Sequence, residues 1–234
     1  MLILAIDTAL DACASAILDT ASSEVIARES MVMKRGHAEA LMPLLARVMQ
    51  QSGLAFDELD RIAVTTGPGS FTGLRVGLSA ARGLALASQK PVVGLTMLAS
   101  FAAPIVARND PQPVLSAIDA RHDHVYFQLV TGDGHPLVSP RVAPIDEALQ
   151  AAGRHPAPHL VGNAAQLLAA RWPAGHPAPA SVDGQAAPDI TWVAWLGAAV
   201  SPEAAPAKPY YLRAPDAKPQ MGAASPGASS QPSP

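Results

Sequence analysis

A short apolar strand that ends in an aspartate occurs twice in this chain, and it constrains the fold more than any other feature. Ala5-Ile6-Asp7 is followed four residues later by Asp11, and Ala117-Ile118-Asp119 is followed four residues later by Asp123. Each apolar run predicts a buried strand, and each is followed by a second apolar segment after the turn. The repeated order of strand, aspartate, turn and strand predicts an internal duplication that gives two similar lobes.

The remaining segments alternate between strand and helix patterns, which is typical of an α/β protein. Apolar runs predict strands at 2–6, 12–18, 25–29, 62–65, 92–93, 114–118, 125–130 and 160–162. Helical periodicity predicts helices at 38–52, from after Ser70 to about 89, and at 97–107, 145–152, 164–171 and 192–200. Two lobes, each a twisted mixed sheet flanked by helices, correspond to the actin-like ATPase (ribonuclease-H-like) fold, in which ligands bind between the lobes.

The expected domain boundaries follow from this duplication. We predict an N-terminal lobe over residues 1–108, carrying the glycine-rich helix, and a C-terminal lobe over 109–213. The segment 173–188 is rich in Pro, Ala and Gly and predicts a loop. Residues 214–234 contain almost no apolar mass, so we predict a disordered tail there.

Composition and charge exclude several classes of protein. The formal net charge is −3 and the 16 Lys and Arg residues are not clustered, so we do not expect this chain alone to bind RNA tightly. A single cysteine, Cys13, excludes a disulfide framework within the chain and predicts a small core residue. No signal peptide precedes the first strand and no apolar run approaches the ~20 residues that span a membrane. These features predict a cytoplasmic protein without a membrane partner.

Two segments near the first strand allow either a functional or a structural interpretation. Asp7 ends that strand, where it could hold a metal-bound nucleotide through water or cap a turn. Gly67-Pro68-Gly69-Ser70 leads directly into a helix, where it could approach a phosphate or form a tight turn capped by Ser70 or Thr72. The loop lacks the lysine of a Walker motif. For this loop and for Asp119 we favour the structural interpretation, and for Asp7 both remain open.

The helix after this loop has small residues at every fourth position. Gly73, Gly77, Ala81 and Ala85 form one ridge, and glycine costs a helix about 0.5–1 kcal/mol relative to alanine, which indicates that something packs closely there. That neighbour is either the chain's own sheet or a partner. Because nearly the whole circumference is apolar or small, we favour a partner. Leucine at Gly77 or Ala81 should then block association while the monomer stays folded.

The preceding helix supports the same interpretation, and no catalytic or metal site emerges elsewhere. Its leucine face supplies core residues, while a second face carries Ala38, Met42 and Met49, and methionine adapts to irregular partners. No His or Cys spacing matches a metal site, and a site at His122 and His124 is not favoured. No nucleophile with a base partner is recognisable from the sequence.

Five segments resemble the TsaB (YeaZ) family. They are 4–8 (LAIDT), 35–43 (RGHAEALMP), 66–77 (TGPGSFTGLRVG), 117–121 (AIDAR) and 209–213 (PYYLR). The resemblance spans about residues 1–213 and implies a role in forming N6-threonylcarbamoyladenosine at position 37 of tRNAs that read ANN codons. It implies a non-catalytic scaffold that binds the TsaD-like catalytic paralogue and helps to recruit a TsaE-like ATPase. It also implies a homodimer in the absence of TsaD, and contact with tRNA only through the complex.

The resemblance also predicts which residues act. The interface residues are expected to be His37, Leu41, Met42, Met49, Thr72, Gly73, Arg75, Val76, Gly77, Ala81 and Arg82. A degenerate nucleotide site is expected at Asp7, Thr8, Gly67, Gly69 and Ser70. We expect no cofactor, although ATP or ADP could bind weakly or at a subunit interface.

A comparison with the catalytic paralogue predicts that this chain is not an enzyme by itself. TsaD-like proteins carry a His-Met-Glu-Gly-His run whose two histidines bind a metal. The matching run here is Met97-Leu98-Ala99-Ser100-Phe101, so Met97 and Phe101 replace both ligands and should be buried. The main alternative is an active ATP-dependent kinase or ATPase of the same fold, although Thr8-Ala9-Leu10 lacks a glycine turn. A peptidase would need a metal or a nucleophile that we do not identify.

Overall fold

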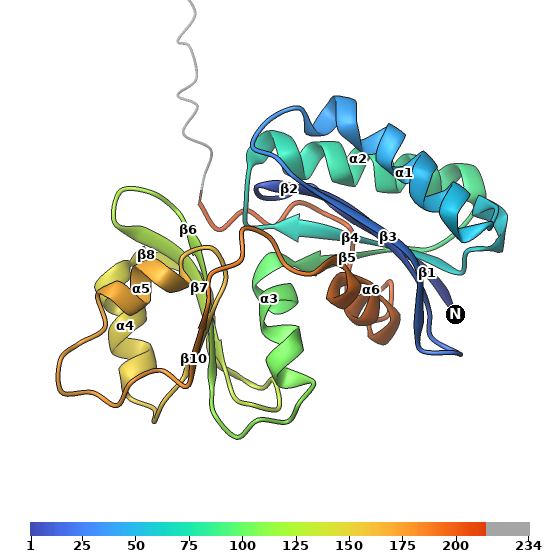
Figure 1. Cartoon of the computed structure of the whole chain (residues 1–234). Helices are drawn as coiled ribbons and strands as arrows, with labels where there is room; N and C mark the ends of the chain where they lie inside the picture. Colours follow the sequence, from blue (N-terminus) through green and yellow to red (C-terminus); the bar gives the residue numbers. More distant parts are fainter. Residues whose placement is uncertain (214–234) are drawn as a thin grey trace, which may run out of the picture.

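The computed structural model of the chain describes residues 1–213 and contains two five-stranded mixed sheets (Figure 1). Sheet A has the order β3-β2-β1-β4-β5, and sheet B has the order β8-β7-β6-β9-β10. Sheet A consists of β1 (Leu2–Asp7), β2 (Ala12–Asp19), β3 (Glu24–Val32), β4 (Arg61–Gly67) and β5 (Val92–Thr96). Sheet B consists of β6 (Val114–Asp119), β7 (His124–Val130), β8 (Pro136–Pro144), β9 (His159–Val161) and β10 (Ser181–Asp183).

The two sheets repeat the same topology. In sheet A, β1 is antiparallel to β2 and parallel to β4, while β3 is antiparallel to β2 and β5 is parallel to β4. In sheet B, β6 to β10 pair in the same pattern and with the same directions. The α/β class, the two lobes and the repeat that the two aspartate motifs predict are therefore confirmed.

Helices cover both faces of the sheets. They are α1 (His37–Ser52), α2 (Phe71–Ser88), α3 (Met97–Val106), α4 (Ile145–Gly153), α5 (Ala165–Ala170) and α6 (Ile190–Ala199), with a short 3₁₀ helix at Phe56–Glu58. The helices α1 and α2 lie side by side on one face of sheet A, and α6 covers the opposite face (Figure 1). In the other lobe, α4 and α5 pack on sheet B, and α3 packs against β6 between the lobes.

Strand β1 shows why this arrangement follows from the sequence. Side chains of a strand alternate between the two faces of its sheet. Leu4 and Ile6 enter the apolar core beneath α1 and α2, whereas Ile3 and Ala5 enter the core beneath α6. Because both faces are covered, an uninterrupted apolar run is stable there, and it leaves Asp7 at the buried end of the strand.

Two edge strands of sheet B are missing from the sequence prediction. Strand β8 contains three prolines, and proline normally argues against a strand because it cannot donate a hydrogen bond to the ladder. An edge strand tolerates proline where its N–H would face away from the sheet. Strand β10 has only three residues and lies within segment 173–188, for which the composition predicts a loop.

The predicted boundary at residue 108 does not hold for the last helix. We expect α6 in the C-terminal lobe, but it packs on sheet A, where Ile190, Val193 and Ala194 join the core. The Arg61 guanidinium donates a hydrogen bond to the Gly197 carbonyl at 2.8 Å, which fixes the end of α6. The chain thus returns to the first lobe near its end. The predicted tail, 214–234, lies outside the described residues.

Candidate functional site

The small-residue ridge of α2, called here the inner face (Gly73, Gly77, Ala81 and Ala85), packs inside the chain. A side-chain carbon at Gly73 would collide with the Thr8 carbonyl oxygen, and one at Gly77 would lie 2.5 Å from Thr8 Oγ1. Thr8 Oγ1 already donates a hydrogen bond to the Gly73 carbonyl at 2.7 Å. The small residues therefore let α2 lie against the turn between β1 and β2. The prediction that this ridge faces a partner is wrong.

Three more predicted interface residues are also buried within the chain. Leu41 and Met49 are 1% and 6% exposed and belong to the core beneath α1 and α2. His37 is 9% exposed, and its Nε2 lies 3.0 Å from the Leu10 carbonyl oxygen. These residues, together with Gly73, Gly77 and Ala81, face the interior because the leucine stripe of α1 and the ridge of α2 converge on sheet A. Sequence periodicity alone does not identify which stripe faces inward.

The opposite side of α2 is accessible, and we call it the outer face (Thr72, Arg75, Val76, Ser79, Gly83 and Leu86). Positions three or four apart lie on one side of a helix, so these six form one stripe. Leu86 is 83% exposed. A side-chain carbon at Gly83 would meet no atom of another element within 4 Å. Packing within the chain therefore explains neither the exposed leucine nor the absence of a side chain at Gly83.

The N-terminal end of the outer face is shallowly hollowed. Phe71, Thr72, Arg75, Val76 and Ser79 line a hollow of about 420 Å³, and the Arg75 guanidinium carbon lies 3.8 Å from the centre of the Phe71 ring. Met42, on α1, is 52% exposed. The predicted interface residues that remain on the surface are Met42, Thr72, Arg75, Val76 and Arg82. The Arg82 Nε donates a hydrogen bond to the Ala207 carbonyl at 3.0 Å.

Asp7 is buried inside a hydrogen-bonded turn. Its Oδ1 accepts hydrogen bonds from the Ala9 N–H at 2.9 Å and from Thr65 Oγ1 at 2.6 Å. Within the described residues, Oδ2 has no hydrogen-bond partner. Burial raises the pKa of the Asp7 carboxyl above its ordinary value, although the bonds from Thr65 and Ala9 and the nearby His37 act in the opposite direction. This geometry corresponds to the turn interpretation of Asp7.

The glycine-rich loop packs on the same turn. The Ser70 N–H donates to the Ala9 carbonyl at 2.8 Å, and a side-chain carbon at Gly69 would collide with that carbonyl. Ser70 Oγ accepts from the Gly73 N–H at 3.2 Å, so of the two predicted N-caps, Ser70 and Thr72, Ser70 caps α2. The chain's own backbone thus occupies the space beside the glycine that a phosphate would need.

A cleft of about 580 Å³ lies between the lobes, at the carboxyl ends of β1 and β6. Open α/β sheets commonly bind ligands at such ends. Its lining consists of Ala9, Leu10, Asp11, Gly69, Ser70, Phe71, Ile118, Asp119, Ala120, Arg121, His122, Tyr126, Asn163, Tyr211 and Arg213. Of the five predicted nucleotide-site residues, only Gly69 and Ser70 line this cleft. Asp7, Thr8 and Gly67 are buried beside it, so the predicted set does not form one exposed site.

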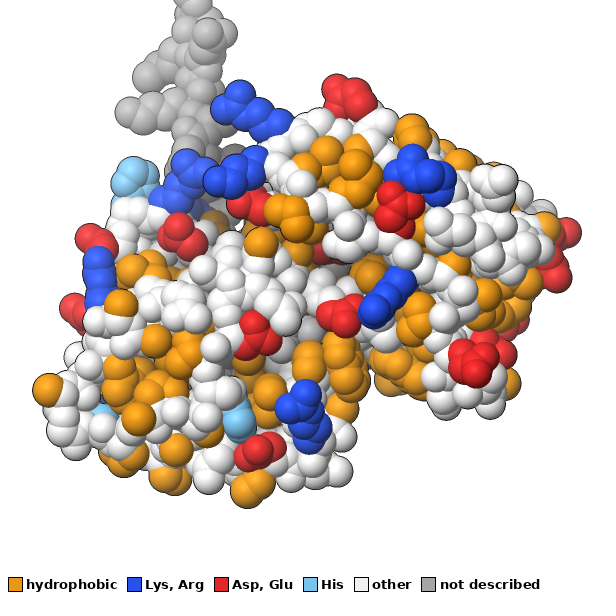
Figure 2. Space-filling model, in the orientation of Figure 1, with side chains coloured by type: hydrophobic (Ala, Val, Ile, Leu, Met, Phe, Trp, Pro, Cys, Tyr) orange, Lys and Arg blue, Asp and Glu red, His pale blue; other side chains and the backbone are white. Residues whose placement is uncertain are grey.

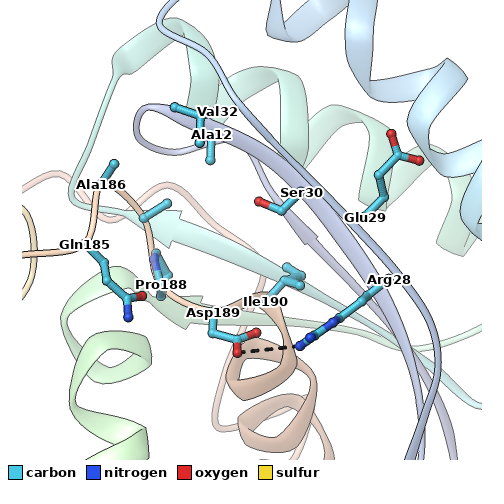
Figure 3. Close-up of a pocket in the computed structure, with 11 residues that line it drawn as sticks. Ala12, Arg28, Glu29, Ser30, Val32, Gln185, Ala186, Pro188, Asp189 and Ile190 are labelled. Atoms are coloured by element: carbon cyan, nitrogen blue, oxygen red, sulfur yellow. Dashed lines mark ion pairs between the residues drawn. The ribbon is translucent and has the colours of Figure 1, made fainter.

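A second groove, of about 470 Å³, runs between the edge strand β3 and the start of α6 (Figure 3). Arg28 points across it to Asp189, and Arg28 Nη1 lies 3.8 Å from Asp189 Oδ2. Glu29 points the opposite way and pairs with Arg47 on α1 at 2.5 Å. The groove contains no aromatic side chain, so it offers a ligand fewer orienting groups than the cleft does.

The positions that match the paralogue's metal ligands are apolar and buried, as predicted. Met97 and Phe101 are 0% and 5% exposed and pack in the cluster around α3 between the lobes. Among residues 1–213, no group of three or more His, Cys, Asp or Glu side chains is arranged to hold a metal ion. Cys13 is a buried core residue, also as predicted, and burial raises the pKa of its thiol to about 11, which disfavours the reactive thiolate.

The structure brings together a serine, a histidine and an aspartate that sequence reasoning missed. His159 Nδ1 lies 2.7 Å from Ser181 Oγ, and His159 Nε2 lies 3.2 Å from Asp110 Oδ2. Ser181 and His159 are register neighbours on β10 and β9, whereas Asp110 precedes β6. None of the three lines the cleft or the groove described above. We interpret the set as a connection that ties the loop before β6 to the edge of sheet B.

No helix in the described part of the chain combines the length and the apolar character that crossing a membrane requires.

A protein-family model described as TsaD, tRNA N6-adenosine threonylcarbamoyltransferase, matches residues 24–167, which is more than half of the chain.

Individual relatives agree with this match. A Haemophilus influenzae protein named tRNA threonylcarbamoyladenosine biosynthesis protein TsaB is 35% identical over 128 residues, which cover 55% of this chain and 53% of that protein. The chain thus spans about half the length of the first curated relatives it matches. An uncharacterized protein of Mycobacterium tuberculosis is 32% identical over 219 residues, 93% of this chain and 94% of the relative.

A solved structure is similar over almost the whole described chain. It is an uncharacterized Pseudomonas aeruginosa protein described as similar to peptidase YeaZ. It has a TM-score of 0.75 and 29% sequence identity, and the match covers 91% of this chain and 99% of that one. The similarity therefore extends over both lobes.

Proposed function

The chain belongs to the TsaB (YeaZ) family, and we propose that it is a non-catalytic scaffold subunit in the formation of N6-threonylcarbamoyladenosine on tRNA. In this proposal it acts in the cytoplasm, binds a TsaD-like catalytic paralogue and helps to recruit a TsaE-like ATPase. It contacts tRNA through that complex and forms a homodimer when the paralogue is absent.

The outer face of α2 is the observation that carries the proposal. An apolar surface made of several neighbouring side chains marks a site that another protein buries, and the exposed Leu86 and the partly exposed Val76 lie on the same stripe of α2. Gly83 lets a partner helix come close without a side chain in between. Arg75, held against Phe71, adds one charged group that a partner carboxylate can bind. We therefore place the interface on the outer face of α2 and on the exposed Met42 of α1.

The absence of catalysis by the chain alone is also a proposal, and two features support it. Met97 and Phe101 are buried apolar side chains that cannot donate a proton and do not supply the imidazole nitrogens with which the paralogue's two histidines bind a metal. Asp7 is enclosed by Thr65 and Ala9, so it cannot reach a metal-bound nucleotide without opening the turn. The same two features argue against the alternative of an active kinase or ATPase.

Co-expression with the TsaD-like paralogue from the same organism tests the proposal. We expect the two chains to co-purify, and we expect threonylcarbamoyladenosine to form on tRNA only when this chain accompanies the paralogue. ATP turnover should be absent when this chain is assayed alone. Failure to co-purify, together with ATP turnover by the isolated chain, would favour the ATPase alternative.

A further inference from the structure

The two sheets have four edge strands, and three of these edges are closed to further pairing. The edge of β5 is covered by the chain itself, since the Gly94 N–H donates to the Ala205 carbonyl at 2.8 Å. Strand β10 has only three residues, and β8 carries three prolines, which cannot donate to a ladder. Proteins protect sheet edges by such features because an open edge pairs with other chains.

Strand β3, the edge of sheet A, has none of these features. It has nine residues and contains neither proline nor lysine. A bulge at Ile26 interrupts its first part, but residues 27–32 pair regularly with β2. The groove of about 470 Å³ in Figure 3 runs beside this regular part, so there is space along the strand. The edge of β3 is therefore open to a further strand.

The register of β3 shows which backbone groups face the open side. The Met33 N–H donates to the Asp11 carbonyl at 3.0 Å, and hydrogen-bonded pairs alternate along an antiparallel ladder. Met31 and Glu29 therefore bond to β2. The residues that direct their N–H and C=O groups away from β2 are Arg28, Ser30 and Val32. In the described part of the chain, no strand takes up these groups.

The side chains along this edge do not oppose contact with another copy of the chain. Val32 is 82% exposed, so its apolar surface gains from being covered. The two charged residues of the regular part are already paired, Arg28 with Asp189 and Glu29 with Arg47. Figure 2 shows acidic and basic side chains close to one another on the N-terminal lobe, so the face in view has no field of one sign.

We propose that β3 pairs antiparallel with β3 of a second copy of this chain, with the two-fold axis at Ser30. The outward groups of Arg28 then meet those of Val32 in the second copy, and Ser30 meets Ser30, which gives about six backbone hydrogen bonds. This is the register in which all three outward residues are paired. A two-fold axis makes the contact closed, so it produces a dimer rather than a fibre.

The same register matches charge between the copies. Between the hydrogen-bonded pairs, Glu29 lies opposite Met31 of the second copy, and such positions bring Cα atoms to about 4.5 Å. Met31 Sδ lies 3.6 Å from Arg47 Nη2 within each copy. Glu29 of one copy is therefore close to Arg47 of the other, and the two-fold axis repeats this contact. An axis at Glu29 would instead place two carboxylates opposite each other, which destabilises a strand pair.

This contact is separate from the interface proposed on the outer face of α2. Helix α2 packs over β4, β1 and β5, whereas β3 lies at the far edge of the sheet. The inference goes beyond the proposed homodimer, because a chain paired through β3 keeps the outer face of α2 free for the proposed TsaD-like partner. A single strand pair buries less than the roughly 1,600 Å² of a standard interface, so we expect a dissociation constant in the micromolar range.

Sedimentation velocity of the full chain at about 1 to 200 μM tests the contact. Ser30→Pro removes a donor that does not bond to β2, so the variant should fold, as β8 does with its prolines. Its self-association should weaken about tenfold or more, because the two-fold axis removes this donor twice. Ser30→Ala keeps the donor and is the matched control, which should dimerise like the wild type. Circular dichroism and thermal unfolding check both variants.

Two charge variants of the exposed Val32 test the register independently of Ser30→Pro. Val32→Lys places a cation opposite Arg28 of the second copy and should weaken the dimer about threefold or more. Val32→Glu places an anion there and should strengthen it by about the same factor. Net charge predicts the opposite order, because the chain carries −3 and Val32→Glu makes each copy more negative.

The proposal is overturned if the chain stays monomeric over this concentration range, or if a folded Ser30→Pro variant associates like the wild type. It is also overturned if the two Val32 variants follow net charge. Loss of the dimer in Gly83→Leu but not in Ser30→Pro would place the second copy on the outer face of α2 instead. Ser30→Pro should still co-purify with the TsaD-like paralogue, so the proposed function is tested separately from this contact.

Discussion

The inner and outer faces of α2 both contain glycine, but the two faces have opposite surroundings. At Gly77, on the inner face, an added carbon would lie 2.5 Å from Thr8 Oγ1. At Gly83, six residues later, an added carbon would meet nothing beyond its own helix within 4 Å. Packing within the chain requires glycine at position 77. The same packing gives no reason for glycine at position 83.

This comparison changes where an interface should be sought. A glycine that is already explained by close packing carries no information about a partner. A glycine in an exposed helix lowers helix stability without any visible gain within the chain. The outer face, with Gly83 and the exposed Leu86, is therefore a stronger candidate than the regular ridge of small residues.

Leucine at Gly77 should have the largest effect. The new side chain must displace Thr8, whose hydroxyl bonds the Gly73 carbonyl in a fully packed region. Overpacking typically costs about 1–3 kcal/mol, and we expect the upper end of that range or more here. Urea unfolding of Gly77→Leu measures the loss, with Gly83→Leu as the control for helix propensity. Equal stability of the two variants would show that the inner face is not tightly packed.

Leucine at Gly83 should act on association instead. We expect Gly83→Leu to stay folded while its dissociation constant for the proposed TsaD-like partner rises about tenfold or more, which corresponds to about 1.4 kcal/mol. Calorimetric titration measures the affinity, and circular dichroism checks the fold. Wild-type affinity in a folded Gly83→Leu variant would remove Gly83 from the interface.

A change at Asp7 should alter the pH dependence of stability by a smaller amount. Burial raises the pKa of Asp7 in the folded state, so between its ordinary and raised pKa the folded chain holds a proton that the unfolded chain has released. Stability therefore falls as pH rises through this window. Asp7→Asn cannot ionise, so its stability should fall less over the same pH range.

The measurement is the free energy of unfolding of the wild type and of Asp7→Asn at several pH values above 4. The difference between the two free energies gives the contribution of Asp7. Surface carboxylates with lowered pKa values, such as Glu29 beside Arg47, titrate in both proteins and cancel. Parallel pH profiles for the wild type and Asp7→Asn would contradict the prediction.

The smallest predicted effect is a gain in stability on replacing Gly83 with alanine. Gly83→Ala adds a methyl group into open space and should stabilise the isolated chain by about 0.5–1 kcal/mol, because alanine favours the helix over glycine. The same substitution at Gly77 should destabilise it. Thermal unfolding of the pair compares the two faces directly, and a change of the same sign at both positions would remove the distinction between them.

Local patterns along the chain identify most of the elements. The apolar runs of β1 and β6 and the aspartates that follow them predict the repeat, because a buried strand and the turn after it depend on adjacent residues. Ser70 is one of the two N-caps that the sequence allows for α2, and this local signal is readable because an N-cap bonds the backbone within three residues. The edge strand β8 escapes prediction because only its position at the edge makes its prolines tolerable.

The sequence by itself determined the α/β class, the two-lobed repeat and the burial of Cys13, Met97 and Phe101. Each of these depends on the local order of apolar and polar residues. Only the tertiary structure decided that Gly73 and Gly77 face Thr8, that α6 returns to sheet A, and that Tyr211 and Arg213 join Arg121 around one cleft. Those relations connect residues that are far apart in the chain, and packing between elements, rather than neighbouring residues, sets their distances.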